Sequence, residues 1–234
     1  MNVLAFDTCL GAVSVAVRWQ SAAGEWLLRE HFEPRTAGHA ERLMPMISEV
    51  MDEAGLAFTD LHRVAVTLGP GTFTGVRVGV AAARGLALAS ALPVVAATSL
   101  AVMAHGAEAL LAAPYPETLG VAVDARRGMV YFQLFGSARE TVGDPQLLAP
   151  QEVASLVGMR PVIVVGPAAQ TVADAIVAGG GQAQARLPDL APHARSLALL
   201  AEGLIPPTSL RPLYLRPPDV KPQADKSLFR AVSR

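Results

Sequence analysis

The chain has 234 residues, of which 52% are hydrophobic and 17% charged, and its net charge is -1. This composition supports one large or two small folded domains and excludes a largely disordered chain. The small net charge excludes a global attraction to nucleic acid or membranes. The single cysteine excludes an intrachain disulfide and fits a reducing cytoplasm, and Asp7 interrupts the first apolar run, so no signal peptide is expected.

The first half of the chain predicts strands and helices in the order β-β-β-α-β-α-β-α, which is typical of a mixed sheet flanked by helices. Alternating and helical apolar spacings, with glycine and proline stops, give these elements. The predicted strands are 3–6, 13–17, 26–32, 64–68 and 94–97, and the predicted helices are 39–54, 74–91 and 98–113.

A second unit follows the break at 114–116. Its predicted strands are 119–123, 129–135 and 161–165, with a hairpin at 124–128 and helices at 151–157, 168–178 and 193–204. Both halves open with strand, turn, strand, so we expect two related α/β lobes, 1–113 and 114–204.

Residues 205–234 form a proline-rich segment in which six basic and two acidic residues give a net charge of +4. Because the whole chain carries -1, residues 1–204 carry -5. The composition predicts an extended, poorly packed tail. Either the tail is only solvated, or it is an arm that contacts a partner protein or RNA phosphates.

The first candidate site is Asp7-Thr8, in the tight turn before Gly11. A carboxylate and a hydroxyl at this place can hold a phosphate and a metal-bound water. The alternative is a plain turn whose side chains bond to nearby backbone.

The second candidate is the segment GPGTFTGVR, which follows a strand and opens a helix. Its glycine spacing matches neither a Walker A motif nor a dinucleotide fingerprint. It is either an anion site at a helix start or a tight strand-to-helix turn. The motif residues are Gly69, Pro70, Gly71, Thr74, Gly75 and Arg77.

Small residues line one face of the helix that follows. Gly75, Gly79, Ala82 and Ala83 lie near one another at helical spacing. Such a face lets a second helix approach closely, as at a partner interface. The alternative is close packing on the chain's own sheet. The five histidines show no paired spacing and no cysteine lies near them, so no metal site is expected.

Several segments together resemble the TsaB (YeaZ) family in order and spacing. They are VLAFDTCLGAVSVAV, HAERLMP, LGPGTFTGVRVGVAAARGLALA, LPVVAATSL, VDARRGMVY and, near the C-terminus, PLYLRPPDVK. The likeness is dense over residues 1–135 and sparser beyond. It implies a two-lobed, actin-like (ASKHA, Hsp70-like) fold and a non-catalytic relative of TsaD, the transferase that makes threonylcarbamoyladenosine in tRNA.

The resemblance also implies partners and their surface. A TsaD-type subunit would pair through helices 39–54 and 74–91, a TsaE-type ATPase would join, and two copies of the chain would pair through the same helices when alone. No cofactor is expected on this chain, since ATP and metal would belong to the partners. The expected interface residues are His39, Leu43, Met46, Gly75, Val76, Gly79, Val80 and Ala83.

The departure from TsaD supports a non-catalytic subunit. TsaD carries a His-x-x-x-His metal pair, and the matching positions here are Ser99 and Met103, which cannot replace two imidazoles. Asp124 and Arg126 belong to the DAR hairpin of the family motif. The competing hypothesis is a small actin-fold ATPase or sugar kinase, for which Asp124 is the sole second-half candidate for the catalytic carboxylate.

Overall fold

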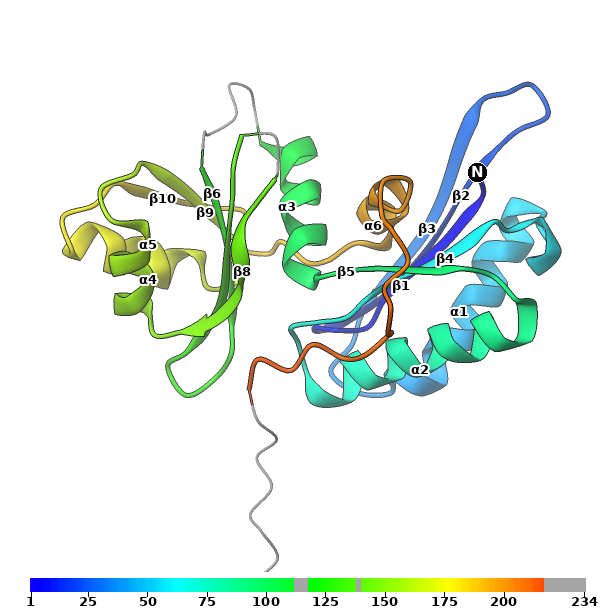
Figure 1. Ribbon diagram of the computed structural model, residues 1–234, viewed down its shortest axis with the longest axis horizontal. Helices are drawn as coiled ribbons and strands as arrows, with labels where there is room; N and C mark the ends of the chain where they lie inside the picture. The colour runs from blue at the N-terminus through cyan, green and yellow to red at the C-terminus, as the bar shows by residue number, and fades with distance from the viewer. Residues whose placement is uncertain (112–117, 138–139, 217–234) are drawn as a thin grey trace, which may run out of the picture.

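Two α/β lobes lie side by side in the computed structural model, which describes residues 1–111, 118–137 and 140–216 (Figure 1). Each lobe is built on a five-stranded sheet, with the strand orders β3-β2-β1-β4-β5 and β10-β9-β6-β7-β8. This architecture confirms the two-lobed α/β fold expected from the sequence.

The first lobe begins with the predicted hairpin. Its elements are β1 (Val3–Asp7), β2 (Ala12–Gln20), β3 (Trp26–Pro34), α1 (His39–Ala54), the short 3₁₀ helix η1 (Phe58–Asp60), β4 (Arg63–Thr67), α2 (Phe73–Ser90), β5 (Val94–Ala97) and α3 (Ser99–Leu110). The strand β1 is central, antiparallel to β2 and parallel to β4, and all its residues are buried. Helices on both faces explain why residues 3–6 of this strand are an unbroken apolar run rather than an alternating one.

Alternate side chains of β1 serve two different cores. Leu4 and Phe6 pack in the cluster that includes Leu43 and Ile47 of α1. Residues Val3 and Ala5 face the opposite side, because successive strand side chains point to opposite faces. The sheet is therefore covered by α1 and α2 on one face and by a different helix on the other.

The second lobe contains β6 (Leu119–Asp124), β7 (Val130–Phe135), β8 (Thr141–Leu148), α4 (Pro150–Val157), β9 (Val162–Val165), α5 (Ala169–Ala178) and β10 (Ala183–Arg186). The sequence did not predict β8 or β10, which are the two edge strands. Strand β8 contains glycine, aspartate and proline, residues that an edge strand tolerates and a central strand does not.

The helix α6 (Ala194–Leu200) follows the second lobe in sequence but covers the first sheet. Its Leu197 and Ala198 pack in the cluster formed by Val3 and Ala5. The range 114–204 therefore groups this helix with the wrong lobe, because hydrophobic packing and not chain order decides which sheet it covers. It is also shorter than the predicted helix 193–204.

The helix α3 lies between the lobes (Figure 1). Its Leu100 and Met103 pack with Leu119 and Val121 of the second sheet, although α3 follows directly from the first sheet. The chain thus leaves the first lobe through α3 and returns to it through α6, so the two lobes share packing elements.

Residues 205–216 run back along the first lobe as a strap (Figure 1). The Leu213 amide donates a 2.7 Å hydrogen bond to the Leu68 carbonyl, and the Arg84 guanidinium donates to the Leu210 carbonyl. This part of the predicted tail is held against the lobe, contrary to the expectation of poor packing. Residues 217–234 and the break at 114–116 lie outside the described residues.

Within the described ranges, none of the helices is both long enough and apolar enough to cross a bilayer.

Candidate functional site

The turn after β1 is closed rather than open to a ligand. Asp7 is 1% exposed. One carboxylate oxygen accepts a hydrogen bond from the Thr67 hydroxyl, and the other accepts one from the Cys9 amide at 3.3 Å. Burial raises the pKa of Asp7 from 3.8 to about 6, although these hydrogen bonds pull it down. Both oxygens of this carboxylate are thus bonded to protein groups, one of them the hydroxyl of Thr67 on the neighbouring strand β4.

Thr8 and Cys9 are bonded to the start of α2. The Thr8 hydroxyl donates to the Gly75 carbonyl at 2.7 Å, and the Thr72 amide donates to the Cys9 carbonyl at 2.7 Å. The backbone of the β1 turn and the first turn of α2 are therefore in direct contact. Gly11, by contrast, is exposed and has no close neighbour at its Cβ position.

The glycines of the GPGTFTG segment permit this contact. A Cβ atom on Gly71 would lie 2.1 Å from the Cys9 carbonyl oxygen, and one on Gly75 would lie 1.9 Å from the Thr8 carbonyl oxygen. On Gly79 it would lie 2.8 Å from the Thr8 hydroxyl. The small-residue face is therefore explained by packing within the chain, which was the alternative to a partner interface.

The same segment forms a tight strand-to-helix turn. Thr72 caps α2 by accepting a hydrogen bond from the Gly75 amide at 3.1 Å. The Pro70 carbonyl accepts from the Ser99 hydroxyl at 2.6 Å. Thr74 and Arg77 point to the exposed side of the helix.

The residues expected at the partner surface are buried by the chain's own fold. His39 is 8% exposed and its Nε2 lies 3.2 Å from the Leu10 carbonyl oxygen. Leu43, Val80 and Ala83 are at most 1% exposed. The apolar periodicity marks the side of α1 and α2 that faces the core of the lobe. The expected interface residues lie on that side and not on the solvent side. The eight buried residues are His39, Leu43, Met46, Gly75, Val76, Gly79, Val80 and Ala83.

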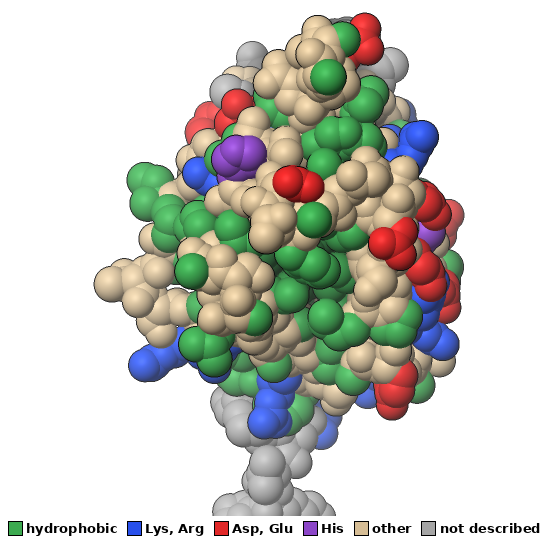
Figure 2. Space-filling model, turned by 90° about the vertical axis from the view of Figure 1, so that its right-hand side faces the viewer, with side chains coloured by type: hydrophobic (Ala, Val, Ile, Leu, Met, Phe, Trp, Pro, Cys, Tyr) green, Lys and Arg blue, Asp and Glu red, His purple; other side chains and the backbone are tan. Residues whose placement is uncertain are grey.

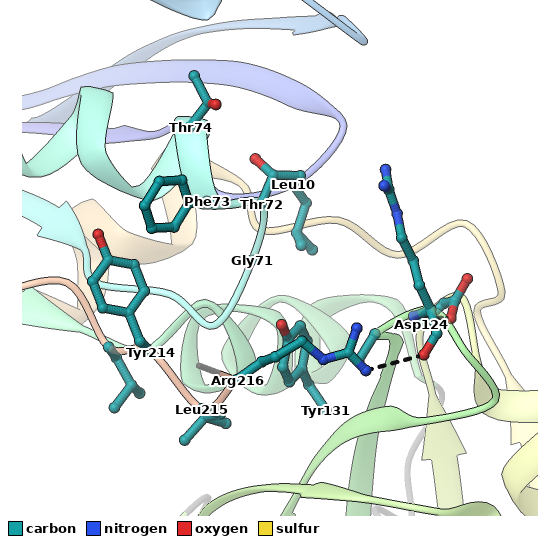
Figure 3. Close-up of a pocket in the computed structure, with 13 residues that line it drawn as sticks. Leu10, Gly71, Thr72, Phe73, Thr74, Asp124, Tyr131, Tyr214, Leu215 and Arg216 are labelled. Carbon is teal, nitrogen blue, oxygen red and sulfur yellow. Dashed lines mark hydrogen bonds between the residues drawn. The ribbon is translucent and has the colours of Figure 1, made fainter. Parts of the chain in front are cut away.

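A hollow lies between the lobes, beside the closed turn (Figure 3). It is a cleft of about 540 Å³, bounded by the start of α2, the β6–β7 turn and the end of the strap. Its lining residues include Leu10, Thr72, Phe73, Thr74, Asp124, Arg126, Tyr131, Tyr214 and Arg216. Three segments that are far apart in sequence therefore meet at one place.

The predicted hairpin residues Asp124 and Arg126 lie on this cleft. The Asp124 carboxylate accepts a 2.7 Å hydrogen bond from the Arg126 amide, which stabilises a turn in which Arg126 adopts a φ of 63°. The Arg216 guanidinium donates to the Arg126 carbonyl at 3.3 Å (Figure 3). The strap therefore connects the first lobe to the second across the cleft.

The positions that match the metal pair of TsaD are fully buried. Ser99 and Met103 are both 0% exposed, and the Ser99 hydroxyl donates a hydrogen bond to the Pro70 carbonyl. No group of three or more His, Cys, Asp and Glu side chains suited to a metal occurs in the part of the chain that the structure describes.

Sequence reasoning missed the aromatic lining of the cleft. Phe73, Tyr131 and Tyr214 come from three separate elements, and no local pattern brings them together. The segment PLYLRPP, which contains Tyr214 and Arg216, is part of the family resemblance, but its composition predicts an unpacked tail.

Comparisons with known proteins find relatives whose names agree with one another. A family model described as TsaD, tRNA N6-adenosine threonylcarbamoyltransferase, matches residues 33–192. The chain is 38% identical over 132 residues to the tRNA threonylcarbamoyladenosine biosynthesis protein TsaB of Escherichia coli, covering 56% of this chain and 54% of that protein. The alignment thus spans about half of that relative's own length.

Two solved structures are similar to this fold. YeaZ from Pseudomonas aeruginosa is 30% identical with a TM-score of 0.75, covering 92% of this chain and 99% of that one. A ROK hexokinase from Thermus thermophilus is 15% identical with a TM-score of 0.50, covering 87% of this chain and 98% of that one. The second likeness concerns the fold alone, and it confirms the actin-like architecture expected from the sequence.

Proposed function

Because the chain belongs to the TsaB (YeaZ) family, we propose that it is a non-catalytic subunit in the biosynthesis of threonylcarbamoyladenosine in tRNA. It pairs with a TsaD-type transferase, and a TsaE-type ATPase joins the pair. The ATP and the metal of the reaction belong to these partners.

The observation that carries this proposal is the closed turn at Asp7. A phosphate-binding turn needs backbone amides that are free to donate to the phosphate. It also needs a carboxylate that can reach a metal ion or its bound water. Here the Asp7 oxygens accept from Thr67 and Cys9, and the Thr8 hydroxyl donates to the Gly75 carbonyl of α2. A kinase or ATPase built on this chain would have to open a packed core, which argues against that competing hypothesis.

We place the partner surface on the solvent side of α1 and α2. Met44 on α1 is 44% exposed, and Leu88 on α2 is 89% exposed. Figure 2 looks onto the end of the molecule formed by the first lobe, and hydrophobic side chains gather across its centre. An apolar surface of this kind supports pairing with another protein, or of two copies when the partner is absent.

Reconstitution tests the function directly. A TsaD-type and a TsaE-type protein are assayed for tRNA modification with and without this chain, and the chain is assayed alone. We expect modification only when all three are present. Modification by this chain alone, or ATP turnover by it at micromolar affinity, would contradict the proposal.

Sedimentation tests the surface. The substitutions Met44→Glu and Leu88→Glu should each weaken pairing with the transferase, because they place a charge in an apolar contact. Leu156→Glu is the matched control, since Leu156 is 41% exposed on α4 of the other lobe. Unchanged pairing in both first-lobe variants would place the interface elsewhere.

A further inference from the structure

The cleft between the lobes has an exposed aromatic wall at the start of α2, at the opposite end of that helix from Leu88. Phe73 and Tyr214 are stacked with ring centroids 5.4 Å apart, yet they are 48% and 45% exposed. The Arg77 guanidinium lies 4.9 Å from the centroid of the Phe73 ring. Large aromatic side chains are normally buried, and a stacked pair left open at a cleft indicates a ligand that covers it.

Guanidinium groups surround this wall. Arg126 and Arg216 line the cleft with the two aromatic rings, and Arg77 lies beside them. The Asp124 carboxylate also lines it, and one of its oxygens accepts from the Arg126 amide. This local positive charge contrasts with the charge of -5 on residues 1–204, so it points to an anionic ligand.

We infer that the cleft binds an unstacked nucleotide of single-stranded RNA. The base stacks on the Phe73–Tyr214 pair, and Arg77, Arg126 and Arg216 contact the adjacent phosphates. Proteins that bind single strands combine aromatic platforms with a cationic track for the backbone in this way. The inference rests on the proposed function, in which tRNA is the substrate of the complex.

The size and position of the cleft favour a nucleotide within a chain over a free nucleotide. A volume of about 540 Å³ suits a single nucleotide and excludes a duplex. Because α2 seals Thr8, phosphates cannot reach the turn that would hold a free triphosphate. They must lie at the rim beside the arginines, where an RNA backbone enters and leaves.

Binding of labelled unmodified tRNA and of oligoadenylate to the full chain tests the inference. We expect Tyr214→Ala to weaken both affinities roughly tenfold or more through loss of stacking, and Tyr214→Phe to retain them. Arg126→Gln should make the slope of log affinity against log salt less negative by about one. Arg186→Gln, on the edge strand β10 away from the cleft, is the control with the same charge change.

Four outcomes would overturn the inference. Both Tyr214→Ala and Arg126→Gln could bind RNA as the wild type does. Double-stranded RNA could bind as well as single-stranded RNA, or AMP could compete as well as oligoadenylate does. The cleft variants could also keep RNA binding and lose pairing with the transferase, which would show that the cleft contacts protein.

The failure of this inference differs from the failure of the proposed function. If the chain is dispensable for tRNA modification in the reconstituted system, the proposed function fails whatever the cleft binds. If the chain is required but the variants bind RNA normally, only the inference fails. Circular dichroism of each variant establishes that it is folded.

Discussion

Individual residues around the β1 turn show that the segment leading into α2 occupies the space beside the turn. In an open phosphate turn the main-chain amides face solvent. Here the carbonyl oxygens of Cys9 and Thr8 lie where Cβ atoms at positions 71 and 75 would otherwise be, so only glycine fits at these two positions. The glycine spacing of the family motif is therefore a packing requirement, and it can be tested by stability alone.

Two glycines of α2 should respond oppositely to substitution by alanine. Gly75→Ala places a Cβ atom 1.9 Å from a backbone oxygen that cannot move freely, so we expect a loss of roughly 1–3 kcal/mol or more. Gly85→Ala meets nothing within 4 Å and should stabilise the helix by about 0.5–1 kcal/mol. Urea denaturation measures both. Equal effects of the two substitutions would show that the close contact does not exist in solution.

The buried carboxylate of Asp7 should make stability depend on pH. Its pKa is raised from 3.8 to about 6 on folding, so its protonated form is favoured in the folded state. Its stabilising contribution is fully present below pH 3.8 and is lost as the pH rises through 6. A shift of this size corresponds to roughly 3 kcal/mol.

The substitution Asp7→Asn isolates this effect. The variant lacks the ionisation, so its stability relative to the wild type should rise between pH 4 and 6 and then level off. Urea titrations of both proteins at each pH give the difference, in which the contributions of the other carboxylates cancel. A difference that does not vary with pH would mean that Asp7 is not buried as described.

At the scale of elements, α6 packs on the face of the first sheet that α1 and α2 leave uncovered. Leu197 is fully buried against β1 and β2, and Leu199 is 45% exposed on the same helix. Leu197→Ala should cost about 2–5 kcal/mol through the cavity that it leaves, whereas Leu199→Ala should change stability by less than about 0.5 kcal/mol. Similar losses for both would indicate that α6 is not docked on the sheet.

The elements also show what the sequence could and could not predict. The helix at 39–54 coincides with α1, because its apolar spacing and Gly55 mark both the buried face and the end, where Gly55 has a φ of 65°. The sequence does not predict the edge strands β8 and β10, because β8 is mostly exposed with no clear alternation and β10 has only four residues. Edge strands are fixed by the neighbour they pair with, and a local pattern does not contain that information.

The candidate site was predicted only in part, for a similar reason. Asp124 and Arg126 were found on a recognisable hairpin, and the structure places both on the cleft. The interface residues were assigned to the wrong side of α1 and α2, because periodicity shows that a helix has an apolar face but not what covers it. Tyr214 joins Phe73 only through the path of the strap, which no local signal shows.

At the scale of the whole molecule, the path of the chain ties the lobes into one unit. Helix α3 leaves the first sheet and packs on the second, and α6 returns from the second lobe to cover the first sheet. The strap then bonds to Leu68 of the first lobe and to Arg126 of the second. The first sheet is covered in part by a helix that follows the second lobe, and α3 connects the two sheets, so we expect the two lobes to unfold together.

A substitution in the second lobe should therefore be detected by a probe in the first. Both tryptophans, Trp19 and Trp26, lie on β2 and β3 of the first lobe, so their fluorescence reports that lobe alone. Val164→Ala removes two methyl groups from the core of the second lobe, where Val164 is fully buried. We expect it to lower the urea midpoint by the same amount in tryptophan fluorescence and in circular dichroism, since a two-state protein gives coincident transitions. A fluorescence midpoint that stays at the wild-type value while the circular dichroism splits into two steps would show that the shared helices do not couple the lobes.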